Sequence, residues 1–214
     1  IGFFPDVGGT WFLQRAPGAV PLYLGLTGVT IGGADSLYAG LADACFSPES
    51  IAALEAELPI AAGAAQPRDA PASLARRHAV PQAPGELEAL RPAIDLHFGR
   101  ESVAAILDSL ESESRPEFQP WAAKMLRLLE ERSPTLLRVT FEQLRRGRGL
   151  GLADSFRLEL NLIHGCFAQG DFVEGIRALI VDKDNAPRWN PRSLAEVTDA
   201  SVAAFFDPRW PAPE

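Results

Sequence analysis

The 214-residue sequence has little cysteine and little histidine. Its two cysteines, Cys45 and Cys166, stand far apart, which predicts two reduced, packed thiols rather than a disulfide framework. This favours a reducing compartment, and we expect a cytoplasmic location. The three histidines, His78, His97 and His164, show no ligand spacing to cysteine or to one another. The sequence therefore predicts no metal site.

Long apolar runs and an excess of positive charge are also missing. No apolar run approaches the ~20 residues that a membrane-spanning helix requires. The first residues show neither the basic segment nor the compact apolar segment of a signal peptide. The 20 Lys and Arg are outnumbered by 28 Asp and Glu, giving a net charge of −8. An acidic chain is a poor candidate for nucleic acid or an anionic membrane surface, so we expect neither as a partner.

What the chain does have is the composition of a globular, helical protein. Hydrophobic residues make up 47% and charged residues 22% of the sequence. Apolar residues follow helical spacing in two segments after residue 99: Val103, Ile106, Leu107 and Leu110 in the first, and Trp121, Met125, Leu128 and Leu129 in the second. The chain is therefore expected to be mainly α, with a helical domain over residues 99–214.

Three further helices are expected in this domain. In "SPTLLRVTFEQLRRG", Ser133 is the expected N-cap, Pro134 the first helical residue and Gly147 the stop. Asp171 is the expected N-cap of another helix, with Glu174 completing a capping box. Between them runs one long apolar stripe, which we expect to lie in the core: Leu152, Phe156, Leu160, Ile163 and Phe167.

The first half of the chain divides into two segments. Residues 1–46 predict three short helices, ended by Gly18, Gly28 and Gly40, and one strand in "LADACF" over 41–46. Residues 47–98 predict a helix followed by a variable connection, because 59–86 are rich in Ala and Pro and lack a period.

Asp6 is the residue that most suggests chemistry. It stands between Phe4–Pro5 and Val7–Gly8–Gly9, and a carboxylate among apolar groups loses hydration, which suits proton transfer. The competing interpretation is an ordinary helix N-cap, which the residue pattern by itself favours.

Two weaker motifs favour structural roles. The Gly-rich "RRGRGLG" at 145–151 lacks the preceding strand and the final Lys-Ser/Thr of a phosphate loop, so a helix end with solvated arginines is expected. The "DKDN" at 182–185 lacks the glycine and the glutamate of a calcium loop, so a turn is expected.

Five stretches together resemble the crotonase (enoyl-CoA hydratase/isomerase) superfamily. The first, "IGFFPDVGGTWFLQRAPG", is similar to the pocket segment of that family, and residues 23–43 are similar to the segment that follows it. Residues 133–147, 171–191 and 196–206 resemble its 3-hydroxyisobutyryl-CoA hydrolase branch, most specifically in "DKD…P.WNP". The resemblance covers nearly the whole chain apart from the Ala/Pro-rich segment.

The resemblance implies that this chain is the C-terminal, helical part of the ClpP/crotonase-like fold. The ββα spiral core, the backbone N–H pair of the oxyanion hole and a catalytic Glu would then lie upstream of Ile1. The missing N-terminal half is the first implied partner, and further copies of the chain in a homo-oligomer are the second.

The resemblance also implies roles for residues near the start of the chain. Asp6 matches the second acidic position of the hydrolase motif, where it would orient water or move a proton. The residues expected to line the substrate pocket are Phe3, Phe4, Val7, Gly8 and Gly9. The implied substrate is an acyl-CoA thioester, with no cofactor other than the coenzyme A it carries. The alternatives are a hydratase or isomerase acting on another acyl-CoA, and a helical assembly module without chemistry.

Overall fold

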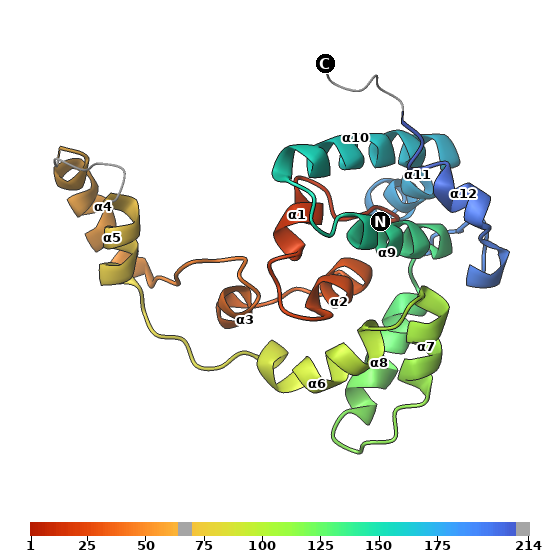
Figure 1. The fold of residues 1–214 in the computed structure, drawn as a ribbon, viewed down its shortest axis with the longest axis horizontal. Helices are drawn as coiled ribbons and strands as arrows, with labels where there is room; N and C mark the ends of the chain where they lie inside the picture. Colours follow the sequence, from red (N-terminus) through yellow and green to blue (C-terminus); the bar gives the residue numbers. More distant parts are fainter. Residues whose placement is uncertain (64–69, 209–214) are drawn as a thin grey trace. The chain divides into compact units, whose positions relative to one another are not determined.

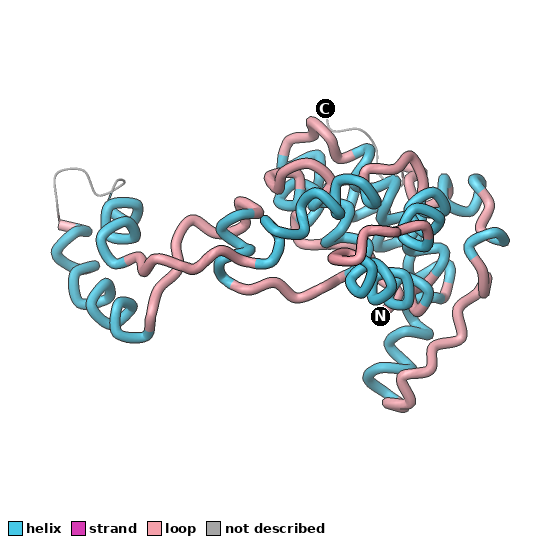
Figure 2. Tube along the Cα trace, turned by 90° about the horizontal axis from the view of Figure 1, so that it is seen from below, coloured by secondary structure: helices cyan, strands magenta, loops and turns pink. Residues whose placement is uncertain are grey.

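The computed structural model describes residues 1–63 and 70–208, and these form helices and loops with no strand (Figure 2). The mainly α prediction is therefore confirmed. The chain divides into two compact units: unit 1 comprises Ile1–Val29 and Leu90–Glu214, and unit 2 comprises Thr30–Ala89. The division of this chain into residues 1–46, 47–98 and 99–214 stays a prediction.

The described helices are labelled in Figure 1. Those of unit 1 are α1 (Gly9–Leu13), α2 (Val20–Thr27), α7 (Val103–Glu111), α8 (Gln119–Glu130), α9 (Pro134–Arg146), α10 (Leu152–Gln169), α11 (Asp171–Ile176), the π-helix η1 (Arg177–Val181), the 3₁₀-helix η2 (Leu194–Glu196) and α12 (Asp199–Ala203). Unit 2 holds α3 (Gly33–Tyr38), α4 (Pro48–Ala62) and α5 (Ala70–His78). The boundary between the units falls within α6 (Glu86–Phe98).

Helix α9 begins and ends where its local signals predict. The Ser133 hydroxyl accepts a hydrogen bond from the Leu136 N–H at 3.0 Å, and Pro134 occupies the first helical position. Gly147 follows the last helical residue. Because these signals act within one turn of the helix end, sequence alone is enough to place it.

Two expectations for unit 2 are wrong. Residues 41–46 form no strand, because no second extended segment pairs with them in the described residues. The connection expected over 59–86 instead contains the end of α4 and all of α5, while residues 64–69 lie outside the described residues. Helices α4 and α5 pack against each other, and Glu57 of α4 pairs with Arg77 and His78 of α5. This pairing and the high helix propensity of Ala, Leu and Glu outweigh the prolines.

The core of unit 1 brings together segments that are far apart in sequence. One cluster joins Phe4, near the start of the chain, to α9, α10 and the segment around α12: Phe4, Leu136, Val139, Leu162, Cys166, Val197, Val202, Phe205 and Phe206. A second contact group is aromatic, with the Tyr23 ring edge-on to Phe98 at 5.2 Å and 5.9 Å from Trp121. The start of the chain is thus anchored on α9, α10 and α12.

Helix α10 buries the face next to the one expected, rotated by about 100° around the helix axis. Its buried stripe contains Ser155, Glu159, Leu162 and Cys166, which follow helical spacing. Most of the apolar stripe faces solvent in the described structure, with Phe156 45% and Phe167 62% exposed. Ile163 alone of the stripe packs against the core cluster. The core prediction is therefore wrong for the other four residues, because hydrophobicity alone does not show which face meets the rest of the fold.

Asp171 is not the N-cap of α11. Gly170 takes that position, and no side-chain cap is formed there. The buried Asp171 carboxylate instead accepts from the Ser133 hydroxyl at 2.6 Å and from the Asn190 N–H at 2.9 Å. Glu174 likewise bonds Arg177 rather than closing a capping box.

Candidate functional site

The candidate site is a tight turn over residues 5–10, which leads into the first residues of α1. The Asp6 carbonyl accepts from the Gly9 N–H at 2.8 Å, which closes the turn. Val7 lies in the left-handed region with φ 55° and is 74% exposed, and Gly8 follows with φ 81°. A β-branched residue with positive φ is a genuine backbone outlier, and such strain clusters at functional sites.

The carboxylate of Asp6 projects from the apex of this turn. Asp6 is exposed and its carboxylate takes no hydrogen bond from any described residue. The N-cap of α1 is Gly8, so the interpretation of Asp6 as an ordinary cap is wrong. Asp6 therefore has an unengaged carboxylate on a closed turn, and its catalytic role stays a prediction.

A buried carboxylate from a distant helix holds one side of the turn. Glu159 of α10 is only 2% exposed. Its two oxygens accept from the Gly8 N–H at 2.8 Å and the Thr10 N–H at 2.9 Å. These N–H groups stand at the start of α1 and have no partner within the helix, so Glu159 supplies the cap that the local sequence lacks.

A buried amide holds the same turn from α9. The Gln143 side chain is fully buried and donates to the Pro5 carbonyl at 2.7 Å and to the Thr10 hydroxyl at 2.8 Å. A side chain at Gly147 would come within 2.4 Å of the Thr10 methyl, so glycine is required for this close approach. Anchors thus lie on both sides of Asp6 and Val7.

The other predicted pocket residues are placed in different surroundings. Phe4 is a core residue, and the half-buried Phe3 stacks on it with ring centroids 4.5 Å apart. Phe3 borders a pocket of about 250 Å³ together with residues of α2 and α9, but Asp6 and Val7 do not line that pocket. Gly8 and Gly9 shape the turn itself. Their contact with substrate stays a prediction.

Glu159 and Gln143 are the residues that the sequence interpretation missed. The available signal was a lone carboxylate on the helix face that also carries Leu162 and Cys166. A charge on such a face requires a buried partner. The stronger apolar stripe on the other face concealed that signal.

The structure also brings together a serine, a histidine and a glutamate. His97 lies 2.8 Å from the Ser109 hydroxyl through Nδ1 and 2.8 Å from Glu113 through Nε2. Arg115 binds the same carboxylate and keeps the pKa of Glu113 well below its usual range. His97 and Ser109 are both buried, and Arg100 also donates to the Ser109 hydroxyl. The arrangement joins α6 to α7 and leaves the serine engaged rather than free for attack.

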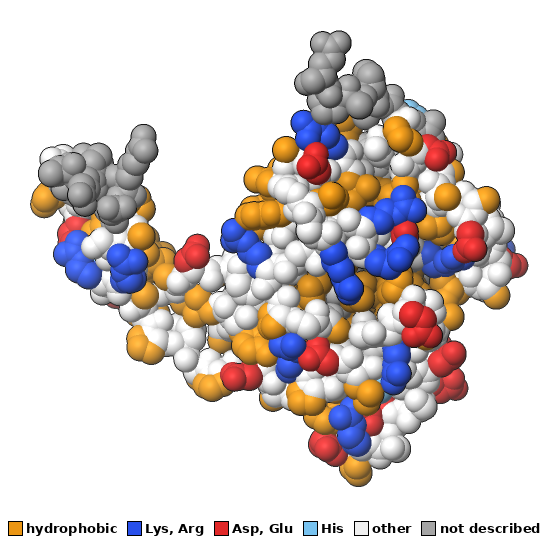
Figure 3. All heavy atoms as spheres, in the orientation of Figure 1, with side chains coloured by type: hydrophobic (Ala, Val, Ile, Leu, Met, Phe, Trp, Pro, Cys, Tyr) orange, Lys and Arg blue, Asp and Glu red, His pale blue; other side chains and the backbone are white. Residues whose placement is uncertain are grey.

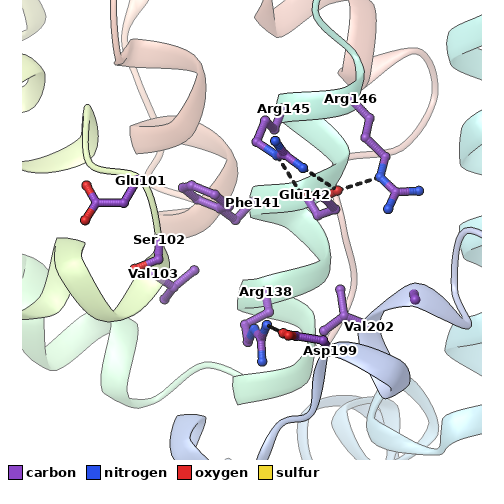
Figure 4. Close-up of a pocket in the computed structure, with 11 residues that line it drawn as sticks. Glu101, Ser102, Val103, Arg138, Phe141, Glu142, Arg145, Arg146, Asp199 and Val202 are labelled. Carbon is purple, nitrogen blue, oxygen red and sulfur yellow. Dashed lines mark hydrogen bonds and ion pairs between the residues drawn. The ribbon is translucent and has the colours of Figure 1, made fainter.

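A pocket of about 420 Å³ beside α9 is lined by three arginines and is a further candidate binding site (Figure 4). Figure 3 shows Lys and Arg side chains gathered across the middle of this face of unit 1, with acidic groups among them. In the pocket, Arg145 and Arg146 both bind Glu142, and Arg138 binds Asp199. With Glu101, three acidic groups balance three arginines. This charge balance does not favour a polyphosphate ligand.

Two other kinds of site are absent from the described part of the chain. No three or more His, Cys, Asp or Glu side chains converge in a way that would hold a metal ion. No helix there combines the length and the hydrophobicity needed to cross a bilayer.

Comparison with known proteins assigns the class. The enoyl-CoA hydratase/isomerase family model matches residues 1–206. The chain therefore belongs to the enoyl-CoA hydratase/isomerase family.

Individual members of the family show which proteins this chain resembles. A Xenopus tropicalis protein named 3-hydroxyisobutyryl-CoA hydrolase, mitochondrial, is 36% identical over 211 residues, covering 96% of this chain and 53% of the relative. Two solved structures are each 36% identical to this chain, which covers 57% of each of them. The first, a carnitinyl-CoA dehydratase from Mycobacterium thermoresistibile, matches 97% of this chain with a TM-score of 0.83. The second, an enoyl-CoA hydratase from Rhodobacter sphaeroides, matches 98% of this chain with a TM-score of 0.76. The chain thus spans about half the length of the proteins it resembles.

Proposed function

We propose that the parent protein of this chain hydrolyses an acyl-CoA thioester, with 3-hydroxyisobutyryl-CoA of valine breakdown as its substrate. The observation that carries the proposal is the exposed, unpaired Asp6 carboxylate on a strained turn that Glu159 and Gln143 hold in place. The likeness to relatives named as hydrolases of that thioester supports the choice of substrate.

In the proposed reaction Asp6 handles the water or the proton. The thioester carbonyl would be polarised by backbone N–H donors supplied by the rest of the parent protein, where preorganised donors stabilise the developing negative charge. An upstream glutamate would act as nucleophile or base. Asp6 would orient the attacking water or transfer a proton, and its turn would hold it in register with the carbonyl.

The exposed apolar face of α10 fits this view of the chain as one part of a larger protein. Leu152, Phe156, Leu160 and Phe167 are each at least 40% exposed. A contiguous exposed apolar face marks an interaction surface. On the proposal, the remainder of the parent protein covers it.

The decisive experiment is Asp6→Asn in the full-length parent. Asn keeps the size of Asp but cannot exchange a proton at neutral pH, so we expect most thioester hydrolysis to be lost while thermal unfolding stays unchanged. Asp154→Asn on the exposed start of α10, which pairs only with Arg157 among the described residues, is the matched control. Near-wild-type turnover by Asp6→Asn would overturn the role of Asp6.

A hydratase or isomerase acting on another acyl-CoA is the second candidate. It is favoured by the two solved structures, whose names are those of a dehydratase and a hydratase at the same 36% identity. Thiol release from the thioester, measured beside loss of enoyl absorbance, separates the two activities.

Cell fractionation would test the predicted cytoplasmic location, since the Xenopus relative is named as mitochondrial.

A further inference from the structure

The turn that carries Asp6 has little local support beyond its backbone hydrogen bonds, such as the one from the Gly9 N–H to the Asp6 carbonyl. Helix α1 has five residues and no side-chain cap, which is too short for independent stability. Val7 with its positive φ adds backbone strain. The geometry of residues 5–10 must therefore be imposed by groups from elsewhere in unit 1.

Glu159 imposes that geometry from a buried position, where its carboxylate contacts the turn rather than solvent. Both of its oxygens accept from backbone N–H groups of the turn, at 2.8 and 2.9 Å, and only 2% of the residue is exposed. The two N–H groups lie on either side of Gly9. The next N–H along the chain, that of Trp11, donates to the Gly8 carbonyl at 2.9 Å. A charged acceptor for two backbone donors is among the stronger hydrogen-bonding arrangements in proteins.

We propose that Glu159 is a positioning residue for the Asp6 carboxylate, acting through the N–H groups of Gly8 and Thr10. This inference rests on the proposed catalytic role of Asp6. Gln143 is the second anchor, because its bonds to Pro5 and Thr10 fix the turn from the side of α9. With both anchors in place, the residues on both sides of Asp6 and Val7 are held by side-chain hydrogen bonds from α9 and α10.

The effect of Glu159→Gln follows from the two donors that it faces. The amide keeps one acceptor oxygen but places an NH₂ group against the other backbone N–H, so one of the two anchors is replaced by a donor–donor repulsion. The turn then shifts by a fraction of an ångström while the core face of α10 keeps its shape. A misplacement of about 1 Å can cost about 100-fold in rate, so we expect kcat to fall roughly 10- to 100-fold.

The test is a double-mutant cycle in the full-length parent, with 3-hydroxyisobutyryl-CoA as substrate. Asp6→Asn, Glu159→Gln and the double variant are compared by kcat, KM and thermal unfolding, with Asp154→Asn on the same helix as the control. We expect Glu159→Gln to lower kcat with KM unchanged, and the double variant to be no slower than Asp6→Asn alone. A residue that acts only through Asp6 loses its effect once the carboxylate is gone.

The outcomes separate the inference from the function on which it rests. If Asp6→Asn is inactive but Glu159→Gln turns over like the wild type, or if the two losses multiply in the double variant, the positioning role is overturned and the role of Asp6 stands. If Asp6→Asn is as active as the wild type, both are overturned. Should Glu159→Gln fail to fold, Glu159→Asp, which keeps the carboxylate but withdraws it by one methylene from the Gly8 and Thr10 N–H groups, is put through the same cycle and judged by the same criteria.

Discussion

The carboxylate of Asp171 accepts the hydroxyl hydrogen of Ser133 at 2.6 Å, which ties the start of α11 to the start of α9. The same serine oxygen caps α9 by accepting from the Leu136 N–H. The second carboxylate oxygen holds the Asn190 N–H of the segment that follows η1. One buried side chain thus links three segments that are distant in sequence.

Removing this carboxylate should destabilise the chain strongly. Asp171→Ala leaves a buried hydroxyl and a backbone N–H without an acceptor, so we expect the free energy of unfolding to fall by about 3 kcal/mol. Asp199→Ala is the control, because that side chain is 97% exposed in its pair with Arg138 and should change stability by less than about 1 kcal/mol. Urea unfolding of both variants measures the difference, and equal losses would contradict the linking role.

Acid stability should depend on Glu174. Hydrogen bonds from Arg177 lower the pKa of Glu174 from 4.5 to about 2. Because the folded-state pKa is depressed, the stability that Glu174 contributes is fully present above about pH 4.5 and is lost as the pH falls towards about 2.

The variant Glu174→Gln tests this pH window. Its deficit in unfolding free energy relative to the wild type should be largest near neutral pH and shrink as the pH falls through the window. Urea titrations at several pH values measure the deficit. A deficit that does not vary with pH would show that the pair contributes through packing rather than through charge.

The two faces of α10 offer a matched pair of substitutions. Leu162 is fully buried and Leu160 is 45% exposed, two positions apart on one helix. In the isolated chain we expect Leu162→Ala to cost about 2–5 kcal/mol and Leu160→Ala less than about 1 kcal/mol. Thermal unfolding measures both, and the reverse order would mean that α10 is turned the other way.

The same pair distinguishes the chain from its parent. If the remainder of the parent protein covers the apolar face of α10, Leu160→Ala should become clearly destabilising in the full-length protein. An unchanged small effect there would leave that face without the proposed partner.

Relieving the backbone strain at Val7 should stabilise the chain. Asn tolerates positive φ far better than Val, so Val7→Asn should raise the free energy of unfolding by about 0.5–1 kcal/mol. Val7→Ala, which removes the branched side chain but keeps a Cβ, is the comparison variant. A lower melting temperature for Val7→Asn would mean that the Val7 side chain makes a stabilising contact that outweighs its strain.

The 214-residue chain alone should hydrolyse thioesters at a negligible rate. The oxyanion donors and the first carboxylate are proposed to lie in the rest of the parent, and one lost oxyanion donor typically costs ~10²–10³ in rate. Release of free thiol from 3-hydroxyisobutyryl-CoA by the purified chain, compared with the full-length protein, is the measurement. Turnover at the parent's rate would show that residues 1–214 carry the complete machinery.

Sequence alone predicts those features whose causes lie within a few residues. Ser133, Pro134 and Gly147 bound α9 correctly because caps and stops act over one turn. The strand over 41–46 and the core stripe of α10 were wrong because each depends on what packs against the segment. For the candidate site, Asp6 was singled out through its neighbours and a family resemblance, and its role stays a prediction. Glu159 was not, because its partners stand about 150 residues away in sequence.

The reach of Glu159 across the sequence also has a consequence for solvent exchange. The amide hydrogens of Gly8 and Thr10 belong to a surface turn, where exchange with deuterium is ordinarily fast. Their acceptor is a buried group on α10, so they become free only when α1 separates from that helix. These two amides should therefore exchange as slowly as those of the core helices, and should report the opening of unit 1 rather than the fraying of a loop.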